Sequence, residues 1–354
     1  MGSSVDSVWH AQDTTPSAIE GAMRTLLHDT HAANSSYVPE RVLNMICVVD
    51  KEYSGEIANR LRTVGRNHPS RTVVCTVEQG RTTLDAVATI AAPADPKPGS
   101  FASTRESIII ACGPQHLPHL DRIVDPLVVS DITTMVWSPH GHEEALQCLL
   151  RLSQTVLFDG VDEPAPADAL NRAAQLSQEA HVVDLAWLRS TPWRERIAAT
   201  FDPAPLRRQL AMMSSMTVRH HPESAVVGLL LLGWLASRLG WDCSALMTRD
   251  GALTGKASGR KQDVALRLEP QREQQVRGLA GIELETAGGR WMRLDRGPGG
   301  LAAQYANAKD VKREWTVLGA SRGEAGILGE GIRQSLLRDP TYAPALAKAQ
   351  ALAS

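Results

Sequence analysis

The sequence predicts an α/β protein: an N-terminal domain with a largely parallel sheet and helices on both faces, followed by a C-terminal α+β domain with an antiparallel meander. Up to residue 160, short apolar runs alternate with segments of helical period, which is typical of parallel sheets covered on both faces. After residue 260, strand-like runs follow one another across glycine-rich turns, which is typical of antiparallel hairpins. The expected domains are 15–160 and 161–354, after a polar N-terminus, 1–14, that we expect to be disordered.

The expected elements of the first domain alternate in type. A helix begins near Thr15-Pro16 or at Ser17, and Ser17 is placed to form a capping box with Glu20. Apolar runs predict strands, and apolar residues at three- and four-residue spacing predict helices. The expected strands are 42–49, 72–77, 86–91, 107–112, 133–137 and 156–159, and the expected helices are 53–64, 117–129 and 143–150.

The second domain is expected to begin after a turn or linker at 160–167. A helix over 222–239 contains an apolar run of 12 residues, which is apolar on all sides, and thus buried, and too short to span a bilayer. The other expected elements are helices 169–180, 205–211, 323–338 and 344–352, and strands 264–269, 279–286, 290–295 and 301–306.

The composition narrows the class of function. A net charge of −2 gives no global attraction for nucleic acid or anionic membranes. The N-terminus has no apolar segment typical of a signal peptide, and the five cysteines form no CxxC motif, so we expect reduced thiols and a cytoplasmic location. Eight tryptophans against three phenylalanines favour binding surfaces, where tryptophan is enriched.

The segment 184–194 concentrates residues typical of such surfaces. Trp187 and Trp193 lie six positions apart, with Arg189 and Arg194 beside them. Thr-Pro at 191–192 is a typical helix start. The segment contains no nucleophilic side chain with a neighbouring general base, so its residue types indicate a docking surface rather than a catalytic one.

Three further segments offer residues suited to chemistry. The loop from His140 to Glu144 follows an expected strand and suits either a divalent metal or a solvated helix start. The glycine-rich turn from Gly319 to Gly329 suits a phosphate, although its spacing differs from the dinucleotide motif. The basic segment 249–261 is either a mobile hairpin tip or a contact for an anion or a partner. No cofactor and no metal is expected.

Three segments together resemble a known family. The first reads D-L-x-W-x-R-x-x-x-W-R over 184–194 and is followed by Phe-Asp-Pro at 201–203. The second reads L-G-W-L-A-S-R-L-G-W over 232–241, and a weaker one reads N-H-P-S-R over 67–71. In this order they resemble the glucose-6-phosphate dehydrogenase assembly protein (OpcA) family.

The resemblance implies a non-catalytic partner and allosteric activator of glucose-6-phosphate dehydrogenase. Such a protein promotes the active oligomeric form of the enzyme and supports NADPH supply in the oxidative pentose phosphate pathway. An activator of this kind binds one state of its target more tightly and needs a specific surface rather than chemistry.

The resemblance also assigns expected roles to residues. Trp187, Arg189, Trp193 and Arg194 are the expected docking residues, together with Trp137, and Trp193→Ala is expected to weaken binding while leaving the fold intact. Thioredoxin is a second partner of some members. Here Cys75 is the candidate redox residue, but position 70 is serine where some relatives have cysteine, so no pair is evident.

Three alternatives stay open. If the tryptophans of 184–194 belong to the core, the interface lies at the loop after Trp137 or at 249–261. A different class of protein, a metal- or nucleotide-dependent enzyme, would use the loop from His140 to Glu144 and the turn from Gly319 to Gly329. A regulatory domain that senses a small molecule would be stabilised by sugar phosphates or nicotinamide cofactors alone.

Overall fold

The structure, a computed structural model, describes residues 4–64, 69–93, 102–306, 312–318 and 323–354, and it divides into two compact units. Unit 1 comprises Met1–Phe158, Glu179–Val183 and Leu328–Leu337. Unit 2 comprises Asp159–Gln178, Asp184–Ile327 and Arg338–Ser354. The main division therefore falls two residues before the expected one, but the chain also returns twice to unit 1, which no composition change in the sequence indicates.

Unit 1 is built around one sheet of nine strands. Its strands are β1 (Ser4–Ala11), β2 (Tyr37–Pro39), β3 (Leu43–Asp50), β4 (Ser70–Val77), β5 (Asp85–Pro93), β6 (Ala102–Cys112), β7 (Thr133–Trp137), β8 (Thr155–Phe158) and β9 (His181–Asp184). Its helices are α1 (Pro16–Ala33), α2 (Ser54–Val64), α3 (Leu120–Val124) and α4 (Glu143–Leu149), with short 3₁₀ turns between them.

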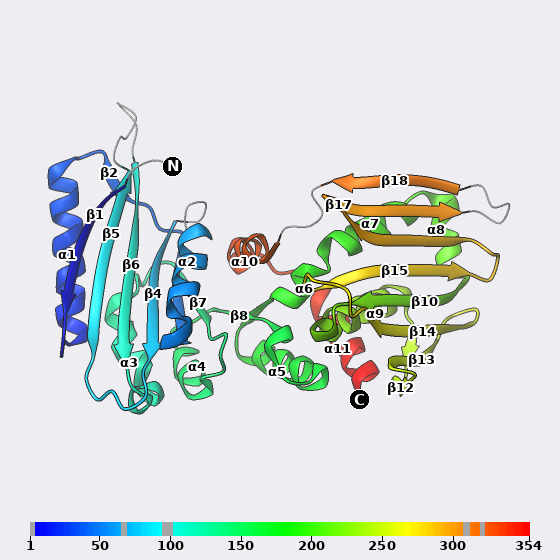
Figure 1. Cartoon of the computed structure of the whole chain (residues 1–354), viewed down its shortest axis with the longest axis horizontal. Helices are drawn as coiled ribbons and strands as arrows, with labels where there is room; N and C mark the ends of the chain where they lie inside the picture. Colours follow the sequence, from blue (N-terminus) through cyan, green and yellow to red (C-terminus); the bar gives the residue numbers. More distant parts are fainter. Residues whose placement is uncertain (1–3, 65–68, 94–101, 307–311, 319–322) are drawn as a thin grey trace. The chain divides into compact units, whose positions relative to one another are not determined.

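The strand order of this sheet is β1-β5-β6-β4-β3-β7-β8-β9, with β2 beside β6. The pairs from β6 through β4, β3 and β7 to β8 are parallel, which confirms the expected parallel sheet (Figure 1). Arg71 and Ile108 lie beside α1, while their neighbours Thr72 and Ile109 lie beside α2. Because successive strand residues point to opposite faces, these two helices cover opposite faces of the sheet.

Two expectations for unit 1 are wrong. The N-terminus expected to be disordered contains β1, which pairs antiparallel with β5, Val8 opposite Thr89. Its stability comes from backbone hydrogen bonds at a sheet edge, which its polar residues do not reveal. The long helix expected over 117–129 is instead the short α3 between two 3₁₀ turns, because Pro118 and Pro126 interrupt the helical hydrogen bonds.

Unit 2 combines a second nine-stranded sheet with helices. Its strands are β10 (Met213–His220), β11 (Asp242–Cys243), β12 (Met247–Arg249), β13 (Ala252–Ser258), β14 (Asp263–Pro270), β15 (Leu279–Thr286), β16 (Trp291–Gly297), β17 (Gly300–Ala306) and β18 (Lys312–Leu318). Its helices are α5 (Pro166–Glu179), α6 (Leu185–Arg189), α7 (Thr191–Phe201), α8 (Ala204–Leu210), α9 (Ala225–Leu239), α11 (Tyr342–Ala353) and the start of α10 (Gly323–Arg333).

The antiparallel meander is confirmed in β15, β16, β17 and β18, which pair in chain order (Figure 1). β10 was not expected as a strand; it pairs antiparallel with β15 and parallel with β14. The segment expected as a mobile hairpin tip contains β13, which pairs with β12 and β14.

The core of unit 2 lies between one face of this sheet and α9. Gly228 of α9 allows the close approach, since a Cβ there would lie 2.3 Å from Leu268 Cδ1. On its other side α9 packs against α11. The segment Pro222–Leu239 is long and apolar enough to cross a membrane by length and composition, but 61% of it is buried inside the fold.

Candidate functional site

The tryptophan- and arginine-rich segment forms α6 and α7 in the interior of unit 2. Asp184 caps α6, its Oδ1 accepting from the backbone N–H of Ala186 at 2.8 Å. The exposed fractions are 3% for Trp187, 6% for Arg189, 1% for Trp193 and 9% for Arg194. None of these four side chains presents a surface to a partner in this fold.

Arg189 is held by carboxylates. Its two Nη atoms donate to the two Oδ atoms of Asp159 at 2.6 and 2.7 Å, and Nη2 also donates to Glu324 at 2.6 Å. Burial lowers the pKa of Arg189, but these carboxylates raise it above its ordinary value. A bidentate buried pair of this kind is a structural clamp between the start of unit 2, α6 and the start of α10.

Arg194 and Trp187 form the second half of this interior network. The guanidinium of Arg194 lies 3.5 Å from the Trp187 ring centroid, and its Nη1 lies 3.3 Å from Asp339 Oδ2. Burial lowers the pKa of Arg194 to about 10. The indole N–H of Trp187 donates to the same carboxylate oxygen at 2.9 Å. The polar groups of the network therefore bond to one another inside the fold.

The fold therefore does not present at its surface the four residues that were expected to dock a partner. Their residue types are those of interface anchors, but Trp187, Arg189 and Arg194 bond to carboxylates within unit 2. Trp193 is among the most deeply buried side chains, so Trp193→Ala is now expected to destabilise the fold rather than to leave it intact.

Trp137, the fifth expected docking residue, is also buried, at 4% exposure, and lies at the carboxyl end of β7. Beside it ends β3. In doubly wound sheets with this strand order, ligands bind where these two central strands end. Here the Tyr53 and His140 rings stack with centroids 4.3 Å apart, and His142 Nε2 lies 3.2 Å from Asp50 Oδ1. Burial lowers the pKa of His140.

These residues do not fit a dinucleotide. The turn after β3 reads Asp50-Lys-Glu-Tyr53 instead of a glycine-rich loop, so carboxylates stand where a pyrophosphate would approach. Among the described residues, no group of three His, Cys, Asp or Glu side chains is placed to hold a metal ion. Glu143 and Glu144 form the first turn of α4. The glycine-rich turn lies partly outside the described residues, and from Gly323 onward it is helix α10.

Cys75 lies buried in β4, and its thiol is free. Burial raises its pKa well above the ordinary value. A buried thiol with a raised pKa is a poor nucleophile, because the thiolate is the reactive form. The fold therefore gives Cys75 none of the features of a redox-active cysteine.

The surface that the sequence interpretation missed is the outer face of the unit 2 sheet, which we define by Arg219, Glu283, Trp291, Arg293 and Asp295. Cross-strand register places these residues on the side opposite the core, where Trp291 is half-buried. Arg293 donates to Glu283 at 2.7 Å and lies 5.9 Å from the Trp291 ring centroid. The alternation Trp-Met-Arg-Leu-Asp over 291–295 is the signal that indicates this face.

Gly281 shapes this outer face. Arg219 crosses over it to reach Asp295, and a Cβ at position 281 would lie 2.2 Å from Arg219 Nη2. The face is therefore a charged surface around one half-buried tryptophan, and its tryptophan and arginines are residue types that are enriched in protein interfaces.

Comparisons with known proteins identify relatives of the sequence. The family model for the N-terminal domain of a glucose-6-phosphate dehydrogenase subunit matches residues 62–175, and the model for the C-terminal domain matches 180–346. The OxPP cycle protein OpcA of Synechococcus elongatus is 27% identical over 152 residues, 40% of this chain and 34% of that protein. The protein of the same name from Synechocystis is 28% identical over 129 residues, 35% of this chain and 27% of that protein.

The chain thus aligns with about a third of the length of these curated relatives. Among solved structures, an oxidoreductase from Bacillus subtilis has a TM-score of 0.47 at 11% identity, covering 88% of this chain and 95% of that one. An oxidoreductase domain protein from Kribbella flavida has a TM-score of 0.43 at 13% identity, covering 88% and 95%. The two family models span most of the sequence, and the chain belongs to the OpcA family of glucose-6-phosphate dehydrogenase subunits.

Proposed function

We propose that this chain binds glucose-6-phosphate dehydrogenase in the cytoplasm and raises its activity without catalysing a reaction. The observation that carries the proposal is the match of both family models, each described as a domain of a dehydrogenase subunit. The turn after β3 supports a role other than dinucleotide-dependent catalysis, since its acidic residues stand where a pyrophosphate would approach.

The docking surface in this proposal is the outer face of unit 2 rather than segment 184–194. Trp291 and Arg293 are accessible there, and the ion pairs around them are already formed in the free chain. A surface that needs no rearrangement loses little entropy on binding. The activating effect then arises if the dehydrogenase binds this face more tightly in its active, assembled state.

The test is the dependence of dehydrogenase rate on glucose 6-phosphate concentration, with and without the chain, using the enzyme from the same source. A lower half-saturating concentration or a higher maximal rate is expected, with co-elution of the two proteins in gel filtration. The matched control is the chain after heat denaturation. Superimposable curves together with separate elution would overturn the proposal.

The accompanying variant is Arg293→Glu, which reverses a charge at the centre of the outer face. It is expected to weaken binding by about tenfold or more, which corresponds to ~1.4 kcal/mol. The control is Arg208→Glu, the same change at an exposed position of α8, and it is expected to leave binding unchanged.

A further inference from the structure

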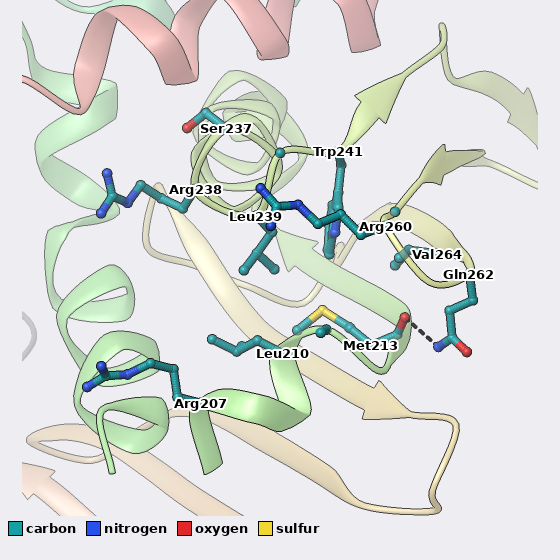
Figure 2. A pocket seen from close by; sticks show the side chains of 13 residues that line it. Arg207, Leu210, Met213, Ser237, Arg238, Leu239, Trp241, Arg260, Gln262 and Val264 are labelled. Atoms are coloured by element: carbon teal, nitrogen blue, oxygen red, sulfur yellow. Dashed lines mark hydrogen bonds between the residues drawn. The ribbon is translucent and has the colours of Figure 1, made fainter. Parts of the chain in front are cut away.

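A pocket of about 370 Å³ opens in unit 2 at the C-terminal ends of α8 and α9 (Figure 2). The turn between β13 and β14 forms its third wall and brings Arg260 and Gln262 to it. This turn belongs to the basic segment 249–261. The volume suits a small molecule and is near the lower end of the range for ligand pockets.

Three arginines from three elements surround the pocket: Arg207 of α8, Arg238 of α9 and Arg260 of the turn (Figure 2). None of the described residues that line it is acidic. Arg207 makes an exposed ion pair with Asp202 at 3.0 Å. No carboxylate of the described chain pairs with Arg238 or Arg260.

The helix dipole explains the positions of two of the three arginines but not of the third. Arg207 and Arg238 lie in the last turns of their helices, where a cation is favoured. Arg260 lies on no helix, so the dipole gives no reason for its position. Guanidinium groups without carboxylate partners attract an anion, and their planar fork matches the oxygens of a phosphate.

The pocket also offers groups that a simple inorganic anion does not use. The last carbonyls of α8 and α9 lack intrahelical partners and accept hydrogen bonds from hydroxyl groups. The Gln262 Nε2 donates to two nearby carbonyls, those of Met212 and Met213, at 2.8 Å each, and Figure 2 shows the bond to Met213. Leu210 and Leu239, both half-buried, supply apolar lining, whereas Trp241 is only 3% exposed. Anion, hydroxyl and apolar sites thus lie within one small volume.

We propose that this pocket binds a sugar phosphate. The phosphate lies against Arg238 and Arg260, the hydroxyls face the carbonyls at the helix ends, and the sugar ring packs against Leu239. The proposal does not rest on the proposed function, because the ligand is measured on the chain alone, and failure of one leaves the other standing.

The experiment is isothermal titration calorimetry of the full chain at constant ionic strength with glucose 6-phosphate, glucose and inorganic phosphate as separate probes. Glucose 6-phosphate is expected to bind about tenfold or more tightly than inorganic phosphate, because only the ester uses all three kinds of group. Glucose alone is expected to give no heat. Equal affinity for the ester and for inorganic phosphate would overturn the assignment and leave a simple anion site.

The variant is Arg238→Ala with Arg260→Ala, which removes two exposed side chains without ion-pair partners in the described chain and is expected to fold. Its affinity for glucose 6-phosphate should fall by about tenfold or more. The matched control is Arg208→Ala with Arg249→Ala, two exposed arginines that do not line the pocket, and it should bind as the parent does. Unchanged affinity in the first variant, or no binding by the parent, would overturn the proposal.

Discussion

Unit 2 contains two pairs of a tryptophan and an arginine, and they lie in opposite environments, one in the interior and one on the surface. Arg194 stacks on Trp187 in the interior, where both side chains are at least nine-tenths buried. Arg293 lies over Trp291 on the outer face of the sheet, where the tryptophan is half-buried and the arginine side chain is 42% exposed. The same two residue types therefore stabilise the fold at one place and form an accessible surface at the other.

The difference lies in the partners that surround each pair. The interior pair shares Asp339, which accepts from both the indole N–H and the guanidinium, so no polar group remains for another protein. The outer pair bonds to Glu283, whose side chain is itself 28% exposed. Residue type alone does not identify a docking surface; the availability of unused polar groups and exposed area does.

The largest effect on stability is expected for Arg189→Ala, which breaks the interior network. The substitution leaves the Asp159 carboxylate buried without its partner, since the Arg189 side chain is 4% exposed and that of Asp159 is 7% exposed. Removing one member of a buried pair costs about 3–5 kcal/mol. We expect a loss of this size in the free energy of unfolding, measured by urea denaturation followed by tryptophan fluorescence.

The control for this variant is Arg293→Ala, the same substitution in an exposed pair. An exposed ion pair contributes about 0–1 kcal/mol, so the free energy of unfolding should change by no more than this. Equal losses in both variants would contradict the distinction between an interior network and an outer surface.

A smaller, pH-dependent effect is expected at Asp184, which lies beside the interior network. Burial and the nearby Asp159 raise its pKa to about 6, although the Tyr342 hydroxyl donates to it at 2.9 Å. The folded state therefore keeps this proton between about pH 4 and 6, where the unfolded chain has released it. The contribution of Asp184 to stability falls as pH rises through this window and is constant above it.

Asp184→Asn isolates this contribution, because Asp162 also has its pKa raised to about 6 by burial and titrates in the same window. An asparagine oxygen still caps α6. The difference in unfolding free energy between the parent and Asp184→Asn, measured in urea from pH 4 to 7, should decline up to pH 6 and then level off. A difference that is independent of pH would mean that Asp184 is ionised throughout.

The central strands and helices of each unit could be predicted from the sequence alone. β3 is buried at seven of its eight positions, and such an apolar run predicts a parallel strand without other information. β1 was missed because an edge strand needs only backbone hydrogen bonds, which polar and small residues provide equally well. The two returns of the chain to unit 1 were missed because they depend on contacts between distant segments.

The candidate site shows the same limit. The residues of 184–194 were singled out in the sequence analysis, but Arg189 bonds to a carboxylate 135 positions away and Arg194 to one 145 positions away. No local pattern reveals such partners, so the residues were assigned to the surface. The outer face was recognisable in principle, because Trp291, Arg293 and Asp295 alternate with apolar residues along one strand.

The most direct test of the account compares Trp193→Phe with Arg293→Glu in their dissociation constants for the dehydrogenase, measured by calorimetry on variants shown to be folded. Trp193→Phe keeps an aromatic ring in the interior, so the account predicts affinity within about twofold of the parent, whereas Arg293→Glu should weaken it by about tenfold or more. Weakened binding by Trp193→Phe together with unchanged binding by Arg293→Glu would contradict the account and return the docking surface to segment 184–194.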